Sequence, residues 1–161
     1  MDPILLLKTV HVLSAIVLFG AGMGTAFHGF MSTLSNDVRA IVVATRNVVL
    51  ADWLFTTPAV IAQPVSGIWL AHLEGWPLTT GWIAASIGLY VLAGACWLPV
   101  VWLQLRMKTL AKEASDAGTA LPSRYGVFFR AWWMLGIPAF AAMVAVVALM
   151  VFKPDLVILG P

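Results

Sequence analysis

The sequence predicts an all-α integral membrane protein, folded as an antiparallel up-down bundle of four helices. Of its 161 residues, 61% are apolar and only 10% are charged, whereas about a quarter of the residues of a soluble domain are charged. The chain also holds four apolar stretches with no strand-like alternation, each near or above the roughly 20 residues that a helix needs to cross the hydrocarbon. We therefore expect a single transmembrane domain, residues 1–161, with the lipid bilayer as its first partner.

The four apolar stretches set the expected boundaries of the helices. The helices are predicted at about 4–31, 48–73, 82–105 and 128–152. The intervening loops are 32–47 and 106–127, with a shorter connection between the second and third helices. Loop 32–47 has apolar residues at helical spacing and is expected to hold a short helix.

Basic residues predict the orientation in the membrane. The two long loops and their borders carry Arg39, Arg46, Arg106, Lys108, Lys112, Arg124 and Arg130. The connection 74–81 has neither lysine nor arginine. Since basic loops stay in the cytoplasm, both long loops are predicted inside and both termini outside. A net charge of +2 confined to loops excludes nucleic acid as a partner.

His11 is the first candidate functional residue, because an ionisable side chain inside a spanning helix is costly and usually faces protein. At 100° per residue it shares a face of its helix with Ser14, Leu18 and Gly22. A neutral buried imidazole suits metal ligation. The competing account is a hydrogen bond to a neighbouring helix, through Ser86 or Gln63.

The second predicted helix carries a line of polar residues on one face. The line consists of Asp52, Thr56, Gln63 and Ser66. Pro58 and Pro64 interrupt the hydrogen bonding of the same helix and release backbone carbonyls that need partners. We expect Gln63 and Ser66 to face the bundle, as interhelical hydrogen bonds or as part of a site. Asp52 is interpreted as a helix-start residue near the inner surface.

Several phrases of the chain resemble a bacterial family of small integral membrane proteins of unknown function. They are KTVHVLSAIVLFGAGMGTAF, VVLADWLFTTPAVIAQPVSGIWLAHLEGWPLTTGW, LYVLAGACWLPVVWLQLRM and FFRAWWMLGIPAF. This resemblance covers nearly the whole chain and implies no activity. It places the protein in a bacterial inner (plasma) membrane as a multi-pass protein.

A more distant resemblance is to the HemJ-type protoporphyrinogen IX oxidases. The matching segments stand in the same order here: Lys8-Thr9-Val10-His11, Thr57-Pro58-Ala59, Gly67-Ile68-Trp69-Leu70, Trp82, Phe128-Phe129-Arg130 and Lys153-Pro154. In that family the first-helix histidine is a haem b ligand, which the resemblance maps onto His11. The family's lysine after the tryptophan is Ser86 here, and the acidic residue after the FFR run is missing. Both departures count against the oxidase activity.

The resemblance implies haem b as a cofactor, with His11 as the metal ligand. Lys8, one turn earlier, would then meet a haem propionate, although snorkelling to the membrane surface also explains it. Gly22 would make room for the flat macrocycle. His72 is expected at a depth similar to that of His11, either as a second ligand or as an exposed loop histidine.

Three functional classes therefore stay open. The first is a haem-binding redox protein. The second is a non-enzymatic membrane subunit or assembly partner, whose partner is another membrane protein. The third is a small transporter, in which the proline-broken second helix lines a path formed by a homo-oligomer. No residue is assigned a catalytic role.

The orientation is tested by cysteine-accessibility labelling in intact cells. A cysteine introduced at Ala117, in the predicted loop 106–127, should be protected from an impermeant reagent added outside, because that loop is basic. Labelling from outside would contradict the predicted orientation.

Overall fold

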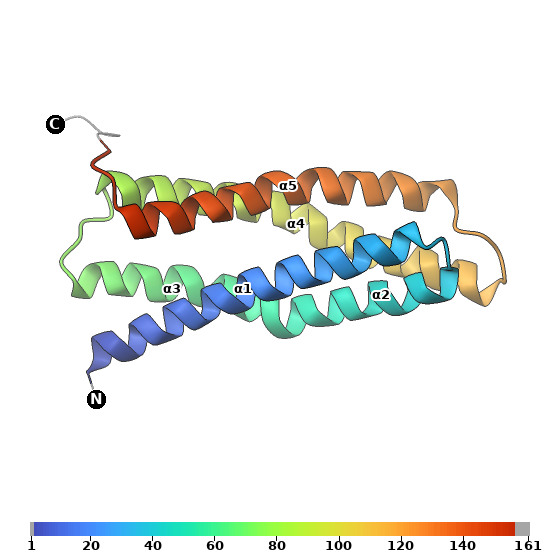
Figure 1. Cartoon of the computed structure of the whole chain (residues 1–161), viewed down its shortest axis with the longest axis horizontal. Coiled ribbons are helices and arrows are strands. Elements are labelled where there is room, and N and C mark those ends of the chain that lie inside the picture. The colour runs from blue at the N-terminus through green and yellow to red at the C-terminus, as the bar shows by residue number, and fades with distance from the viewer. Residues whose placement is uncertain (1, 157–161) are drawn as a thin grey trace.

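The computed structural model describes residues 2–156, and over these residues the protein is an all-α bundle, as the sequence predicted (Figure 1). Five α-helices and one π-helical segment follow one another along the chain. They are α1 (Pro3–Leu34), α2 (Val38–Ala51), η1 (Asp52–Thr56), α3 (Thr57–Leu73), α4 (Gly81–Asp116) and α5 (Ser123–Phe152). Because α2, η1 and α3 form one continuous helical stretch, residues 2–156 contain four helical stretches long and apolar enough to cross a membrane.

The stretches run up and down along one long axis, so the connections gather at two ends (Figure 1). The α1–α2 turn and the α4–α5 loop lie at one end, which we call the basic end because the basic loop residues lie towards it. The N-terminus, the α3–α4 connection and the end of α5 lie at the other, which we call the terminal end. Which end faces the cytoplasm remains a prediction.

The second spanning helix starts about ten residues earlier than expected, at Val38. Most of the predicted loop 32–47 is therefore helix. Its start is capped by the Asp37 carboxylate, which accepts a hydrogen bond of 2.9 Å from the backbone N–H of Arg39. The buried residues Ile41, Ala44 and Val48 then recur every three or four positions. This amphipathic pattern buries one face of the extension against the bundle, which explains why it is helical.

The predicted loop 106–127 is shortened in the same way. Helix α4 continues to Asp116 and α5 begins at Ser123, so only residues 117–122 separate them. The extension of α4 buries Met107, Ala111 and Ala114, which again follow helical spacing. Both extensions lie at the basic end, where the hydrophobic core is largest.

That core joins α2, α4 and α5 near the basic end. Its buried residues are Ile41, Val100, Leu103, Met107, Ala111, Tyr125 and Trp132. Aromatic pairs connect α1 to α5, with Phe30 against Trp133 and Phe19 against Phe140. A smaller cluster of Ala71, Trp82 and Ile83 lies towards the terminal end. The larger cluster contains the two most deeply buried apolar residues described, Ile41 and Ala111.

The π-helical segment η1 marks the point where the second span changes from α2 to α3. The backbone N–H of Thr57 bonds the carbonyl of Asp52 across five residues, where an α-helix would bond across four. Pro58 follows directly and, lacking an N–H, cannot bond the carbonyl of Leu54, against which its ring would also clash in an α-helix. Widening the turn relieves that conflict.

Replacing Ile41 tests the core at the basic end. Ile41 is 0% exposed, so Ile41→Ala should leave a cavity and lower the free energy of unfolding by about 2–5 kcal/mol. Val43 lies on the same helix but is 57% exposed, and Val43→Ala should change stability by less than about 0.5 kcal/mol. Unfolding of the purified protein in detergent measures both, and equal losses would contradict the packing described.

Candidate functional site

The His11 side chain leaves α1 towards α3 and meets the hydroxyl of Ser66. Its Nδ1 lies 2.8 Å from the Ser66 Oγ, and Ser66 is buried. The expectation that His11 faces protein is therefore met. The partner of the imidazole itself is Ser66 and not Ser86, while the other expected residue, Gln63, bonds the His11 backbone.

The hydrogen bonds of Ser66 decide which ring nitrogen of His11 carries the proton. The Ser66 hydroxyl donates to the carbonyl of Ala62, at 2.5 Å. A hydroxyl has one proton to donate, so towards His11 the Ser66 Oγ acts as an acceptor. We therefore assign the imidazole proton to Nδ1. A neutral imidazole then has an unprotonated Nε2 with a lone pair available to a metal ion or to a donor.

The backbone at His11 is bound to α3 as well. The Gln63 side-chain amide donates to the His11 carbonyl at 2.9 Å, and the Ser14 hydroxyl donates to the same carbonyl at 3.0 Å. Gly67 lies beside the ring, and a Cβ at that position would come within 3.1 Å of the His11 Cε1. Gln63 and Ser66 are both buried and face α1, which confirms that they point into the bundle.

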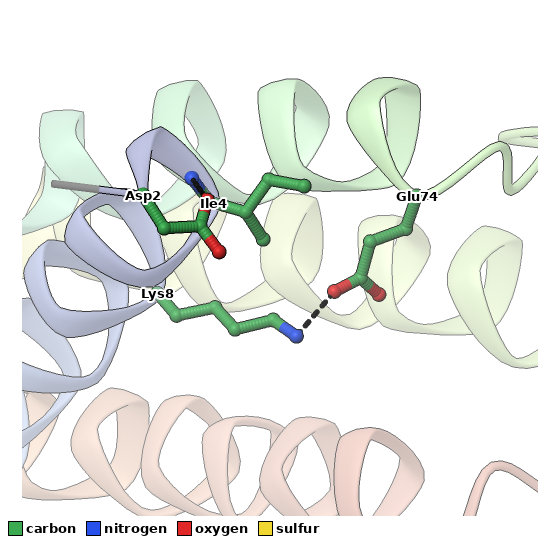
Figure 2. A network of polar contacts seen from close by, with 4 residues as sticks. All are labelled: Asp2, Ile4, Lys8 and Glu74. Carbon is green, nitrogen blue, oxygen red and sulfur yellow. Dashed lines mark hydrogen bonds and ion pairs between the residues drawn. The ribbon is translucent and has the colours of Figure 1, made fainter.

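Lys8, one turn before His11, forms an ion pair at the terminal end of the bundle. Figure 2 shows its side chain reaching from α1 to Glu74, the residue that caps α3, with Nζ 2.5 Å from Oε1. The hydrogen bond from the Lys8 ammonium lowers the pKa of the Glu74 carboxyl, and the charges of Lys8 and Lys153 lower it further. Since both side chains reach solvent, the pair contributes little to stability.

The structure does not bring Gly22 or His72 to the imidazole of His11. Gly22 lies 11 residues further along α1, about 16 Å at 1.5 Å per residue, and it lines a separate cavity. His72 is exposed and follows Ser66 by six residues, which places it about 9 Å further along α3 and about 120° around the helix. Within residues 2–156 no group of three His, Cys, Asp or Glu side chains is arranged to hold a metal ion.

Asp52 lies in a different environment from the one that the sequence suggested. It is within the continuous second span and 5% exposed, so its interpretation as a helix-start residue near the surface is wrong. The Thr56 hydroxyl donates to its Oδ1 at 2.9 Å. The sequence signal was present in the polar line shared with Thr56, but the apparent start of the helix at residue 48 hid it.

Lys8→Gln tests the terminal ion pair. Without the ammonium, the pKa of the Glu74 carboxyl should rise towards its ordinary value, because a neutral partner stabilises the carboxylate less. In the wild type the pair should weaken as the pH falls through the lowered pKa, since protonation removes the charge that Lys8 contacts. Carboxyl NMR titration of labelled glutamate measures this. Lys112→Gln, which alters a separate ion pair with Asp116, is the control and should leave Glu74 unchanged. An unshifted Glu74 in Lys8→Gln would contradict the contact.

Comparison with known protein families matches residues 5–154 to a family described as predicted integral membrane proteins, DUF2269. No curated protein and no solved structure gives a significant match. The family match covers nearly all of the chain and agrees with its four apolar helical spans. The protein therefore belongs to the DUF2269 family of integral membrane proteins.

Proposed function

We propose that this protein is a haem b-binding membrane redox protein in which Nε2 of His11 would ligate the iron. The observation that carries the proposal is the hydrogen bond between Nδ1 of His11 and Ser66. Histidines that ligate metals nearly always donate their other ring N–H to a fixed acceptor, which sets the tautomer and orients the ring. The Ser66 hydroxyl gives its proton to the Ala62 carbonyl, so its oxygen is such an acceptor for His11.

The residues around His11 fit a ligand role in part. Ser66 and Gln63 hold its side chain and its backbone, and Gly67 leaves room for the ring. Bound haem would supply one-electron chemistry, with its potential set by the axial ligands and by burial. This chain's own contribution would be to keep the Nε2 lone pair unprotonated and oriented.

The other residues that the resemblance implied fit less well. Lys8 would bind a propionate only by giving up Glu74, an exchange between two carboxylates of similar chemistry. Gly22 lines a different cavity and His72 is exposed, so the proposal does not use them and assigns no second ligand. Ser86 is buried and donates to the Trp82 carbonyl, which leaves it no proton to offer a substrate. We therefore propose electron transfer and not porphyrinogen oxidation.

The location belongs to the same proposal. A bacterial inner membrane with both termini outside would put His11, at the terminal end, in the outer half of the bilayer. The support is the concentration of basic residues at the opposite end, which is typical of the cytoplasmic side.

Haem binding is tested on the purified full-length protein in detergent, with haem supplied during expression. The wild type should show a Soret band with about one haem per chain, and His11→Ala should lose it. Ser66→Ala should keep the ligand but weaken haem affinity by about 10–100-fold, the usual effect of losing a supporting hydrogen bond. His28→Ala, on an exposed position of the same helix, is the matched control and should bind haem as the wild type does.

Two results would overturn the proposal. If the folded wild type takes up no haem, haem binding is wrong. If His11→Ala keeps the spectrum and occupancy of the wild type, another residue is the ligand. A thermal melt of each variant separates loss of haem from loss of fold.

A further inference from the structure

A cavity of about 510 Å³ lies among α1, α4, α5 and the second span, away from His11. Its walls are almost entirely apolar and include six aromatic side chains. These are Phe19, Tyr90, Trp97, Trp132, Trp133 and Phe140. Met23 and Ile137 also line it and are more than half exposed on the outer surface of the bundle. The cavity is therefore accessible from the surface that lipid covers.

The polar part of the cavity wall is formed by Asp52, Thr56 and Gln104. Asp52 is 5% exposed, and while its Oδ1 accepts from Thr56, its Oδ2 has no hydrogen-bond partner among the described residues. A buried carboxylate oxygen without a partner is expensive, and most of all at membrane depth. Among the described residues, the lining contains no lysine, arginine or histidine that could pair with it.

Within the described part of the chain, Trp132 carries the other buried polar atom without a partner, Nε1, but Trp132 has a second cavity beside it. Trp132 also borders a second cavity of about 20 Å³, together with Thr33, Thr45 and Tyr125. That volume is enough for one water molecule, and the hydroxyls around it are suitable partners. Of these two cavities, Asp52 borders the large one, with Gln104 beside it, so a further partner for its Oδ2 would come from there.

We propose that the large cavity binds a lipophilic organic cation, a hydrophobic amine or onium ion, with its charge against Asp52 and its apolar body among the aromatic rings. A positive charge is what an unpaired carboxylate in a low-dielectric site requires. The faces of Trp, Tyr and Phe attract cations as well. The apolar walls and the opening to lipid favour a molecule that partitions into the bilayer over a hydrated metal ion.

Other occupants satisfy these observations less well. A lipid acyl chain would fill the apolar volume and leave the Oδ2 of Asp52 without a partner. A neutral molecule such as a quinone would suit a protonated Asp52, and the neutral competitor described below tests for it. The π-helical turn strengthens the assignment to Asp52, because such single wide turns occur frequently at functional sites, and this one begins at Asp52.

Binding of tetraphenylphosphonium to the purified full-length protein, measured by equilibrium dialysis, tests the proposal. The wild type should show one saturable site, and Asp52→Asn should weaken it by about tenfold or more, since a buried charge loses its partner. Glu74→Gln removes a carboxylate from the same span outside the cavity and should leave the affinity unchanged. Gly94→Phe should abolish binding, because nothing lies within 4 Å of a Cβ there and the ring would occupy the cavity.

Triphenylphosphine oxide, a neutral molecule of similar shape, distinguishes the cation from other lipophiles. It should not displace tetraphenylphosphonium from the wild type. If it competes equally well, or if a folded Asp52→Asn binds as the wild type does, the cation proposal is wrong. Non-saturable uptake that Gly94→Phe does not alter would mean partition into detergent and would also overturn it. Should Asp52→Asn fail to fold in a thermal melt, the neutral competitor and Gly94→Phe decide.

Discussion

The constraint on which this fold depends is that polar groups inside a bilayer must find their partners within the protein. Most hydroxyls on the spanning helices meet it locally, as Thr45 does by donating to the Ile41 carbonyl and Ser86 by donating to that of Trp82. Tyr90 meets it between helices, since its hydroxyl donates to the Val60 carbonyl. That carbonyl lies four residues before Pro64, which has no N–H to offer it. The hydrogen bond thus ties α4 to α3 at a place where a proline would otherwise leave a bare acceptor.

The same constraint explains why His11 and Asp52 stand apart from the other polar residues. His11 is satisfied through Nδ1 and through its carbonyl, and only Nε2 is left with unused capacity. Asp52 is satisfied at one oxygen and not at the other. His11 contacts the second span at Ser66, and Asp52 belongs to that span. Residues 52 and 66 are about 21 Å apart along the helix. The two proposed sites are therefore physically separate, and the chain offers each its own unsatisfied atom.

The sequence predicted the architecture well, because length and hydropathy are sufficient to identify a spanning helix. It predicted the helix ends poorly. The extensions at Val38 and Asp116 are amphipathic and not uniformly apolar, so hydropathy could not identify them, although the spacing of Ile41 and Thr45 did indicate helix. The inward direction of Gln63 and Ser66 followed from their polarity. Their exact partners could not be predicted. Pairing between α1 and α3 depends on how each helix is rotated about its axis, and the pattern of one helix does not give that rotation. The surroundings of Asp52 were missed for a related reason, since the predicted start at residue 48 placed Asp52 in the first turn of the helix.

The π-helical turn has a consequence for how the second span could change. A turn of this kind holds one residue more than an α-helical turn, so it acts as a single-residue offset in the register between α2 and α3. Because the π turn takes up one extra residue within a single turn, rewinding Asp52–Thr56 as ordinary α-helix with no residue lost would turn everything after it by about 100°. Ser66 and Gln63 would then leave the face that meets α1, and the hydrogen bonds at His11 would have no acceptor or donor. The face of α3 that meets His11 is thus set at Asp52, some four turns away, by the width of a single turn.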